Sequence, residues 1–251
     1  MTFGSLFAGI GGFDLGFDRA GMQCLWQVEK DDWCRSILAK HWPHVERYED
    51  VRDVGKHNLR TVDVICGGFP CPAFSRSGKE GGFEQDDLFF QITRIAQDLQ
   101  PKFIVFENVK GFTRWREVLH KEVEDIGYEW CDMVLDARDF GIPQARERYF
   151  AICVQRGMLS CSQHLWGIQR EKGSGIYGIQ PNAQDSQGWW TPTIRSKEGW
   201  RTIFSAARRC GTSDGIPNRM DRIRGLGNAV VPQIAEYIGQ CLMAHNRAHR
   251  A

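Results

Sequence analysis

Short apolar runs alternate with helical patterns over the first 154 residues. Six runs have the length and composition of buried strands: Gly4–Phe7, Leu25–Val28, Val62–Cys66, Phe103–Phe106, Trp130–Leu135 and Tyr149–Val154. Helical spacing falls between them, in a segment with Leu15 and Phe17 and in Asp31–His41, Leu88–Leu99 and Thr113–Ile126. Pro101 is expected to stop the helix before it, and Thr113 to cap the next one. This alternation predicts βαβ units and a mostly parallel α/β sheet.

The pattern changes after residue 155. Residues 155–218 are rich in Gly, Gln, Ser and Asn and contain few periodic apolar positions. We expect a small irregular lobe with a modest core there. A last periodic segment, Pro232–Met243, predicts a helix whose apolar side chains share one face.

Composition excludes several classes of protein. With 251 residues, 42% hydrophobic and 25% charged, the chain is typical of a soluble globular protein and not of a disordered, collagen-like or coiled-coil chain. No stretch approaches 18 apolar residues, and the first residues lack the basic start of a secretion signal. The nine cysteines include no Cys-x-x-Cys pair, which argues against a disulfide framework or a four-cysteine zinc site. We therefore expect a cytoplasmic protein without a metal.

The net charge of +1 hides an asymmetry along the chain. Residues 1–154 carry 19 basic and 25 acidic side chains, or −6, whereas residues 195–251 carry 10 and 4, or +6. A basic C-terminal quarter fits a face that contacts phosphates, although a solvated surface gives the same count.

A glycine-rich turn follows the first strand. The run Ala8-Gly9-Ile10-Gly11-Gly12-Phe13 lies between strand and helix, where glycines let the backbone approach a ligand. The dinucleotide fingerprint fails because position 14 is Asp, yet Glu29 lies 20 residues after Gly9, at the end of the second strand. Asp50 is the next acidic candidate along the chain. The pattern favours a nucleoside-bearing cofactor over a purely structural turn.

A cysteine lies at the next strand end. Val62–Cys66 runs into Gly67-Gly68-Phe69-Pro70-Cys71-Pro72, so Cys71 falls at the edge of the sheet where substrates bind. A thiol there is a candidate nucleophile, and a buried inert cysteine is the alternative. A zinc nucleobase deaminase is excluded, because Phe74 stands where its second cysteine is needed and no His-x-Glu occurs.

Charged side chains flank the following strands. Glu107 comes directly after Phe103–Phe106, in the same row of strand ends as Cys71. Partial burial would raise its pKa, so that it could share a proton with a heterocycle. Arg146 and Arg148 precede the last strand at i, i+2, which places them on one face, able to hold a carbonyl, a phosphate or a carboxylate.

Taken together, these residues resemble the DNA (cytosine-5)-methyltransferase family. The matching pieces occur in the family's order: Phe7-Ala8-Gly9-Ile10-Gly11-Gly12, Glu29, Asp50-Val51, Gly67-Gly68-Phe69-Pro70-Cys71, Glu107-Asn108-Val109, Gln144-x-Arg146-x-Arg148 and Gly227-Asn228-Ala229-Val230-Val231-Pro232. Each piece is short, but six or more in order are highly specific. The resemblance covers residues 1–154 and about 219–245.

The resemblance implies the fold and the cofactor. The fold would be that of class I S-adenosylmethionine-dependent methyltransferases, a Rossmann-like doubly wound sheet, with a small irregular target-recognition lobe. The cofactor would be S-adenosylmethionine, bound by Phe7, Ala8, Gly9, Gly11, Gly12, Glu29, Asp50, Val51, Pro70 and Asn228. In that site Glu29 would take the ribose, and Asp50 with Val51 the adenine.

The resemblance also implies the reaction, a methyl transfer to carbon 5 of a flipped-out cytosine in double-stranded DNA. Cys71 would add to carbon 6, and Glu107 would hydrogen-bond ring nitrogen 3 and the amino group. Arg148, helped by Arg146, would engage the base carbonyl. The candidate DNA contacts are Ser75, Arg76, Lys79, Arg209 and Arg219.

The same resemblance divides the chain into three parts. Residues 1–155 would form the catalytic and cofactor-binding domain, 156–218 the target-recognition region, and 219–251 a segment returning to the catalytic domain. The recognition stretch is short, as in compact phage-borne or restriction-modification enzymes. A monomeric state and a cognate restriction endonuclease as partner are further expectations. Pro72 follows Cys71 where the family more often has Gln, and both occur.

Three other functions stay open. A tRNA cytosine-5 methyltransferase would use the same chemistry, but the Cys-Phe-Thr signature of that branch is absent. A catalytically silent relative would bind DNA only, although the catalytic positions are intact. A nicotinamide oxidoreductase would use the same glycine turn.

Overall fold

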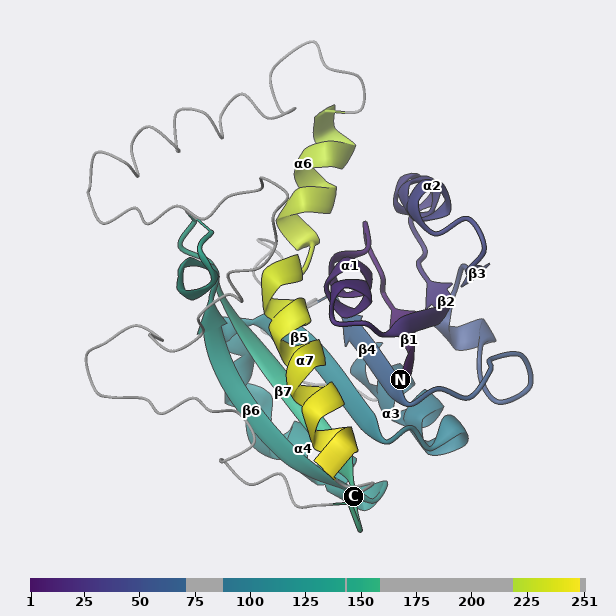
Figure 1. Cartoon of the computed structure of the whole chain (residues 1–251), viewed down its shortest axis with the longest axis vertical. Coiled ribbons are helices and arrows are strands. Elements are labelled where there is room, and N and C mark those ends of the chain that lie inside the picture. Colours follow the sequence, from purple (N-terminus) through teal and green to yellow (C-terminus); the bar gives the residue numbers. More distant parts are fainter. Residues whose placement is uncertain (71–87, 143, 159–218, 249–251) are drawn as a thin grey trace.

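In the computed structural model the described residues are 1–70, 88–142, 144–158 and 219–248. Within them one sheet runs in the order β3-β2-β1-β4-β5-β7-β6 (Figure 1). Neighbours from β3 to β5 pair in parallel, whereas β7 pairs antiparallel with β5 and β6. The strands are β1 (Thr2–Leu6), β2 (Gln23–Val28), β3 (Glu46–Tyr48), β4 (Val64–Gly68), β5 (Phe103–Val109), β6 (Tyr128–Asp136) and β7 (Glu147–Gln155).

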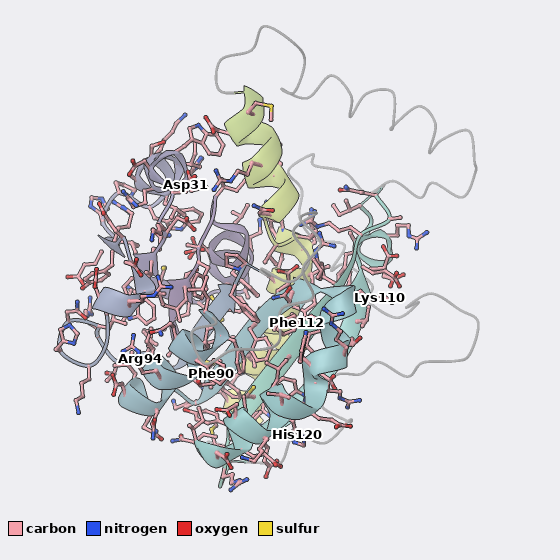
Figure 2. The ribbon with its side chains drawn as sticks, turned by 180° about the vertical axis from the view of Figure 1, so that it is seen from behind. Asp31, Phe90, Arg94, Lys110, Phe112 and His120 are labelled. Carbon is pink, nitrogen blue, oxygen red and sulfur yellow. The ribbon has the colours of Figure 1, made fainter. Side chains whose placement is uncertain are left out.

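Helices cover both faces of this sheet. Figure 1 shows α7 and α1 in front of it, and Figure 2 shows the opposite face, with Arg94 on α3 and His120 on α4. The helices are α1 (Gly12–Arg19), α2 (Asp32–His41), α3 (Leu88–Leu99), α4 (Arg116–Asp125), α6 (Arg219–Asn228) and α7 (Pro232–Ala248). Short 3₁₀ turns are η1 (Val51–Asp53), η3 (Lys110–Trp115) and η4 (Ala137–Phe140). The predicted doubly wound α/β sheet is confirmed.

Strand β5 shows how the sequence divides its side chains between the two layers. Phe103 and Val105 belong to the core under α1 and α7, and Ile104 and Phe106 to the core under α3 and α4. All four are buried, as a central strand with both faces covered requires. The period of two then turns Glu107 toward the α1 and α7 side.

Most of the predicted elements are present. All six predicted strands occur, and α3 has the predicted bounds Leu88–Leu99. Four of the strands are two or three residues longer than predicted. The predicted strands Gly4–Phe7 and Val62–Cys66 are instead shifted, to Thr2–Leu6 and Val64–Gly68. The expected capping role of Thr113 is wrong, because Thr113 lies inside η3 and α4 begins at Arg116. The sheet is mixed, since β6 and β7 form an antiparallel pair at its edge.

Two properties of the described residues bear on the predicted class of protein. None of their helices is both long enough and apolar enough to cross a membrane. They also contain no group of three or more His, Cys, Asp or Glu side chains arranged to hold a metal ion.

Candidate active site

The turn between β1 and α1 has an unusual backbone. Phe7 has φ 53°, Gly9 has φ 57° and Gly11 has φ 88°. The left-handed region suits glycine but is strained for a phenylalanine, and such strain concentrates at functional sites. The turn lies at the carboxyl end of β1, and a Cβ atom at Gly9 would meet nothing within 4 Å, so its backbone is open to a ligand there.

Glu29 holds this turn from the neighbouring strand. It follows β2, and its Oε2 accepts a hydrogen bond from the N–H of Gly9 at 2.7 Å. Its Oε1 accepts from the N–H of Asp31 at 2.8 Å. A carboxylate offers about four lone-pair sites, so both oxygens keep capacity for a further donor. The predicted position of Glu29 at the end of the second strand is confirmed.

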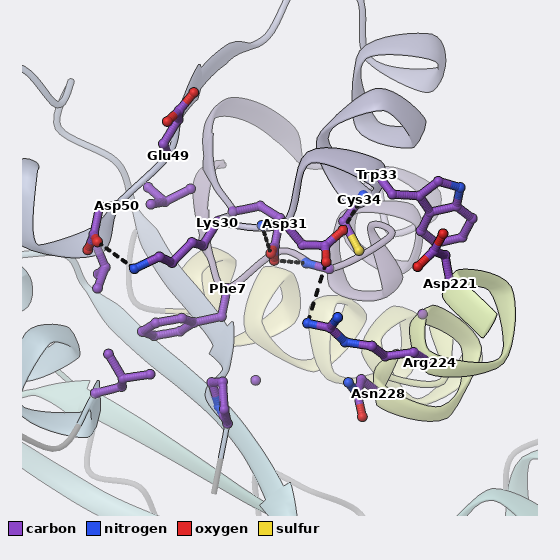
Figure 3. A pocket seen from close by; sticks show the side chains of 18 of the residues that line it. Phe7, Lys30, Asp31, Trp33, Cys34, Glu49, Asp50, Asp221, Arg224 and Asn228 are labelled. Carbon is purple, nitrogen blue, oxygen red and sulfur yellow. Dashed lines mark hydrogen bonds and ion pairs between the residues drawn. The ribbon is translucent and has the colours of Figure 1, made fainter. Parts of the chain in front are cut away.

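A cavity of 620 Å³ opens beside this carboxylate, and Figure 3 shows it from close by. Seven of the ten predicted cofactor residues line it: Phe7, Gly9, Glu29, Asp50, Val51, Pro70 and Asn228. They come from the ends of β1, β2, β3 and β4 and from α6, segments that lie far apart in the sequence. The carboxylate of Asp50 accepts hydrogen bonds from the N–H of Arg52 at 3.0 Å and from Lys30 Nζ at 3.2 Å.

The remaining three predicted cofactor residues lie outside the cavity lining. Ala8 donates its N–H to the carbonyl of Val28 at 3.1 Å. A Cβ atom at Gly11 would lie 2.5 Å from the ring of Trp42, and one at Gly12 would lie 2.3 Å from the carbonyl oxygen of Val230. Gly11 and Gly12 therefore permit close packing around the site.

We expect Gly12→Ala to lower the free energy of unfolding by about 1–3 kcal/mol. The added methyl group would overlap backbone atoms of Val230, which cannot rotate away as a flexible side chain could. Urea titration followed by circular dichroism measures the change. Gly227→Ala is the matched control, because a Cβ atom there meets nothing within 4 Å. Equal midpoints for both variants would contradict the packing argument.

Glu107 lies at the end of β5, on the far side of β4 from the glycine turn. Its side chain is 8% exposed and its Oε1 lies 3.0 Å from Arg148 Nε. Burial raises its pKa to about 7, although Arg148 and Arg146 oppose the shift. Gly68 is its partner in the sheet register, and a Cβ atom at Gly68 would lie 3.0 Å from Glu107 Oε2. The carboxyl group thus lies beside the strand end that leads to Pro70.

The two predicted arginines converge on this carboxyl group. Arg146 is buried, and its Nη2 donates to the carbonyl of Ala229 at 2.8 Å. Burial and the neighbouring Arg148 lower the pKa of Arg146. Its Nε is buried without a hydrogen-bond partner among the described residues, as expected of a donor reserved for another group. Both arginines act on the carboxyl group of Glu107, as their i, i+2 spacing predicts, although Arg146 lies just before β7 and not within it.

The pKa of Glu107 predicts a pH dependence of stability. The unfolded chain releases this proton near pH 4.5, whereas the folded chain keeps it to about pH 7. The contribution of the Glu107 carboxyl group to the free energy of unfolding is therefore fully present below pH 4.5, and it is lost as the pH rises to about 7. We expect the free energy of unfolding of the wild type, relative to Glu107→Gln, to fall by on the order of 3 kcal/mol between pH 4.5 and 8.

Urea titrations of both proteins at the two pH values test this expectation. The comparison within each pH cancels the contributions of the other titrating groups. A difference between the two proteins that stays constant with pH would show that the Glu107 carboxyl titrates normally.

Several predicted residues lie outside the described residues. These are Cys71, Ser75, Arg76, Lys79 and Arg209. Arg219 begins α6, but its side chain is not among those described. Pro70, directly before Cys71, lines the cavity. The carbonyl of Phe69 accepts from Asn108 Nδ2 at 3.1 Å, which ties the exit of β4 to that of β5.

Sequence reasoning missed two parts of the site. Asp14 is fully buried under the glycine turn, where it accepts from Gln27 Nε2 at 2.8 Å and from Ser5 Oγ at 3.0 Å. Burial raises its pKa to about 6. Asp31 and Arg224 form an ion pair at the cavity (Figure 3). Asp14 could have been found from the sequence, because it is an acid within the apolar start of α1. The ion pair of Asp31 with Arg224 joins distant segments and can be found only from the tertiary structure.

Known proteins similar to this chain agree with the geometry. The Type II methyltransferase M.HhaI of Haemophilus parahaemolyticus is 37% identical over 166 residues, which cover 63% of this chain and 50% of that protein. M1.HphI, a Type II methyltransferase of the same organism, is 40% identical over 164 residues, 59% of this chain and 44% of that protein. The chain thus spans about half the length of these curated relatives.

Two solved structures share the fold over nearly the whole chain. A DNA modification methyltransferase encoded within an E. coli prophage superposes with a TM-score of 0.67 at 20% identity, covering 98% of this chain and 99% of the other. The Dnmt2 methyltransferase of S. pombe superposes with a TM-score of 0.64 at 15% identity, with the same coverage. The family described as C-5 cytosine-specific DNA methylase matches residues 1–182. Because that match spans well over half of the chain, the protein belongs to the C-5 cytosine-specific DNA methylase family.

Proposed function

We propose that this protein transfers a methyl group from S-adenosylmethionine to carbon 5 of cytosine in double-stranded DNA. The observation that carries the proposal is the buried carboxyl group of Glu107, 3.0 Å from Arg148 and at the strand end next to the one leading into Cys71. Family membership supplies the reaction class, and this pair supplies groups suited to a pyrimidine.

The cavity residues fit S-adenosylmethionine. A volume of 620 Å³ is in the range of small-molecule sites, and the strained turn at Phe7 and Gly9 gives a cofactor close access to the backbone. Glu29 and Asp50 offer acceptors for ribose hydroxyls and an adenine amino group, as proposed from the sequence. When bound, the cofactor supplies an electrophilic methyl group on a sulfonium sulfur.

The side chains of the protein activate the base. Carbon 5 of cytosine is a poor nucleophile, so the Cys71 thiolate adds to carbon 6 and the electron pair of the 5,6 double bond becomes available at carbon 5. Glu107 holds a proton near neutral pH and donates it toward ring nitrogen 3, where negative charge builds. Arg148 binds the base carbonyl. Once carbon 5 carries the methyl group, a base removes the carbon 5 proton. The electron pair of that C–H bond re-forms the 5,6 double bond, and the Cys71 sulfur leaves carbon 6 as a thiolate.

The substrate must leave the duplex before this chemistry begins. Inside a duplex neither face of carbon 6 is accessible, so the cytosine is flipped out at a cost of a few kcal/mol. We propose residues 156–218 as the target-recognition region, since β7 ends at Gln155 and α6 begins at Arg219. The basic C-terminal quarter would contact phosphates. A cognate restriction endonuclease, a monomeric state and a cytoplasmic location stay predictions.

Methyl transfer from tritiated S-adenosylmethionine tests the proposal directly. We expect label in duplex DNA, recovered as 5-methylcytosine after hydrolysis, and none in a tRNA transcript offered in parallel. Bisulfite sequencing of DNA from a host that expresses the chain would give the target sequence. Label in tRNA alone, or no label with either nucleic acid, would reject the proposal.

A further inference from the structure

The cavity has two chemically different ends. Asp50 lies on one side of Phe7, and Asp31 with Arg224 lies on the other (Figure 3). Resting on the proposed function, we propose that Asp31 and Arg224 bind the amino-acid head of S-adenosylmethionine. Asp31 takes its ammonium group and Arg224 takes its carboxylate.

Asp31 is held ready for a cation. It is the N-cap of α2, and its Oδ1 accepts from the N–H of Cys34 at 3.0 Å. That hydrogen bond, with a smaller contribution from Arg224, keeps the pKa of Asp31 below its ordinary value. Its Oδ2 lies 3.4 Å from Arg224 Nη2, and both residues line the cavity. The capping bond fixes the carboxylate in place, so little side-chain freedom is lost on binding.

Arg224 is placed to receive an anion. It lies four residues before Asn228 on α6, so both side chains share one face of the helix and both line the cavity. Its side chain is 68% exposed, and its ion pair with Asp31 is long at 3.4 Å. A guanidinium carries five N–H donors in a planar fork and can bind a carboxylate through two of them.

A close contact between helices brings these two charges together. A Cβ atom at Gly225 would lie 2.6 Å from the ring of Trp33 and 3.1 Å from Ile10 Cγ2. Helix α6 can therefore approach α2 this closely only because residue 225 has no side chain. The result is an acid and a base at 3.4 Å, a charge pair complementary to an amino-acid zwitterion.

A purely structural role is the alternative explanation of the ion pair. In that case the pair would only hold α6 against α2, and its loss would change the affinity of every cavity ligand equally. Ligands that differ only in the amino-acid head distinguish the two. S-adenosylhomocysteine carries the ammonium and the carboxylate, its decarboxylated analogue keeps only the ammonium, and 5′-methylthioadenosine has neither.

Isothermal titration of the full chain with these three ligands tests the proposal without any turnover. We expect Arg224→Gln to weaken S-adenosylhomocysteine about tenfold and to leave the other two ligands within about twofold. We expect Asp31→Asn to weaken both ammonium-bearing ligands by about five- to tenfold and to spare 5′-methylthioadenosine. Asparagine preserves the helix cap while it removes the charge.

Arg19→Gln is the matched control, since it removes an exposed arginine of α1 that lies outside the cavity lining. Arg224→Lys should recover part of the affinity for S-adenosylhomocysteine. Equal losses for all three ligands, or no loss for any, would overturn the assignment and leave the proposed function intact. A wild-type chain that binds none of the three would overturn both.

Discussion

Replacing Glu107 by glutamine is expected to lower the single-turnover rate of methyl transfer to duplex DNA by about 10²- to 10⁴-fold. The carboxyl group is buried beside Arg148 and has a pKa of about 7, so much of it carries a proton near neutral pH. A glutamine amide keeps the size and one donor but cannot transfer a proton to a ring nitrogen. It therefore loses the stabilisation that grows as negative charge builds on the base.

Rapid-quench measurements with tritiated S-adenosylmethionine report this rate. Glu122→Gln in α4 is the matched control, because it makes the same chemical change outside the cavity lining. Binding of S-adenosylhomocysteine to Glu107→Gln should stay within about twofold of the wild type, since Glu107 is not among the cavity residues. A transfer rate within threefold of the wild type would remove Glu107 from the proposed chemistry.

The same carboxyl group links activity to stability. Burial raises the pKa of Glu107, and this shift destabilises the folded chain above pH 4.5. Arg148 at 3.0 Å offsets part of that cost and also limits the shift. Glutamine is therefore expected to give a more stable and nearly inactive protein at neutral pH. Such a trade-off is typical of a residue kept for catalysis.

Local patterns were sufficient for much of the fold. The apolar positions of α3 recur at helical spacing and Pro101 follows two residues after the helix, so its bounds could be predicted without tertiary information. The alternation in β5 and β7 likewise reflects two covered faces, which any central strand of such a sheet must satisfy.

Two elements could not be predicted because context decides them. Strand β3 consists of Glu46–Tyr48, a polar edge strand held by pairing with β2, and no apolar run marks it. Thr113 has the chemistry of a helix cap, yet the chain after β5 continues in η3, where Phe112 is 2% exposed and packs against Phe69. Burial of that aromatic pair outweighs a capping hydrogen bond of about 1 kcal/mol.

Some residues of the candidate site could likewise be predicted from local patterns, whereas others depend on the tertiary structure. Glu29 and Glu107 follow apolar strands directly, so their place at the sheet edge follows from the strand pattern. The ion pair of Asp31 with Arg224 joins residues 193 positions apart in the chain, and it depends on the absence of a side chain at Gly225. No local periodicity carries that information.

Replacing Cys71 by serine is expected to reduce methyl transfer by on the order of 10⁴-fold or more. A serine hydroxyl is scarcely ionised at neutral pH and is a far weaker nucleophile than a thiolate, so carbon 6 of the base is not attacked. Without that addition, carbon 5 is too weak a nucleophile to attack the methyl group. Cofactor affinity should not change, because the glycine turn, Glu29 and Asp50 are untouched.

A covalent trap separates this role from a merely structural one. In duplex DNA containing 5-fluorocytosine, fluorine at carbon 5 cannot leave as a proton does, so the sulfur–carbon bond formed by the wild type persists through a denaturing gel. Cys71→Ser should give no such band, whereas Cys241→Ser, a half-buried cysteine of α7, should give the wild-type amount. A trapped complex with Cys71→Ser would mean that another residue attacks the base. The buried pair of Glu107 and Arg148 would then act together with that other nucleophile. Their proposed role depends on a thiol at position 71 that attacks the base from the neighbouring strand end.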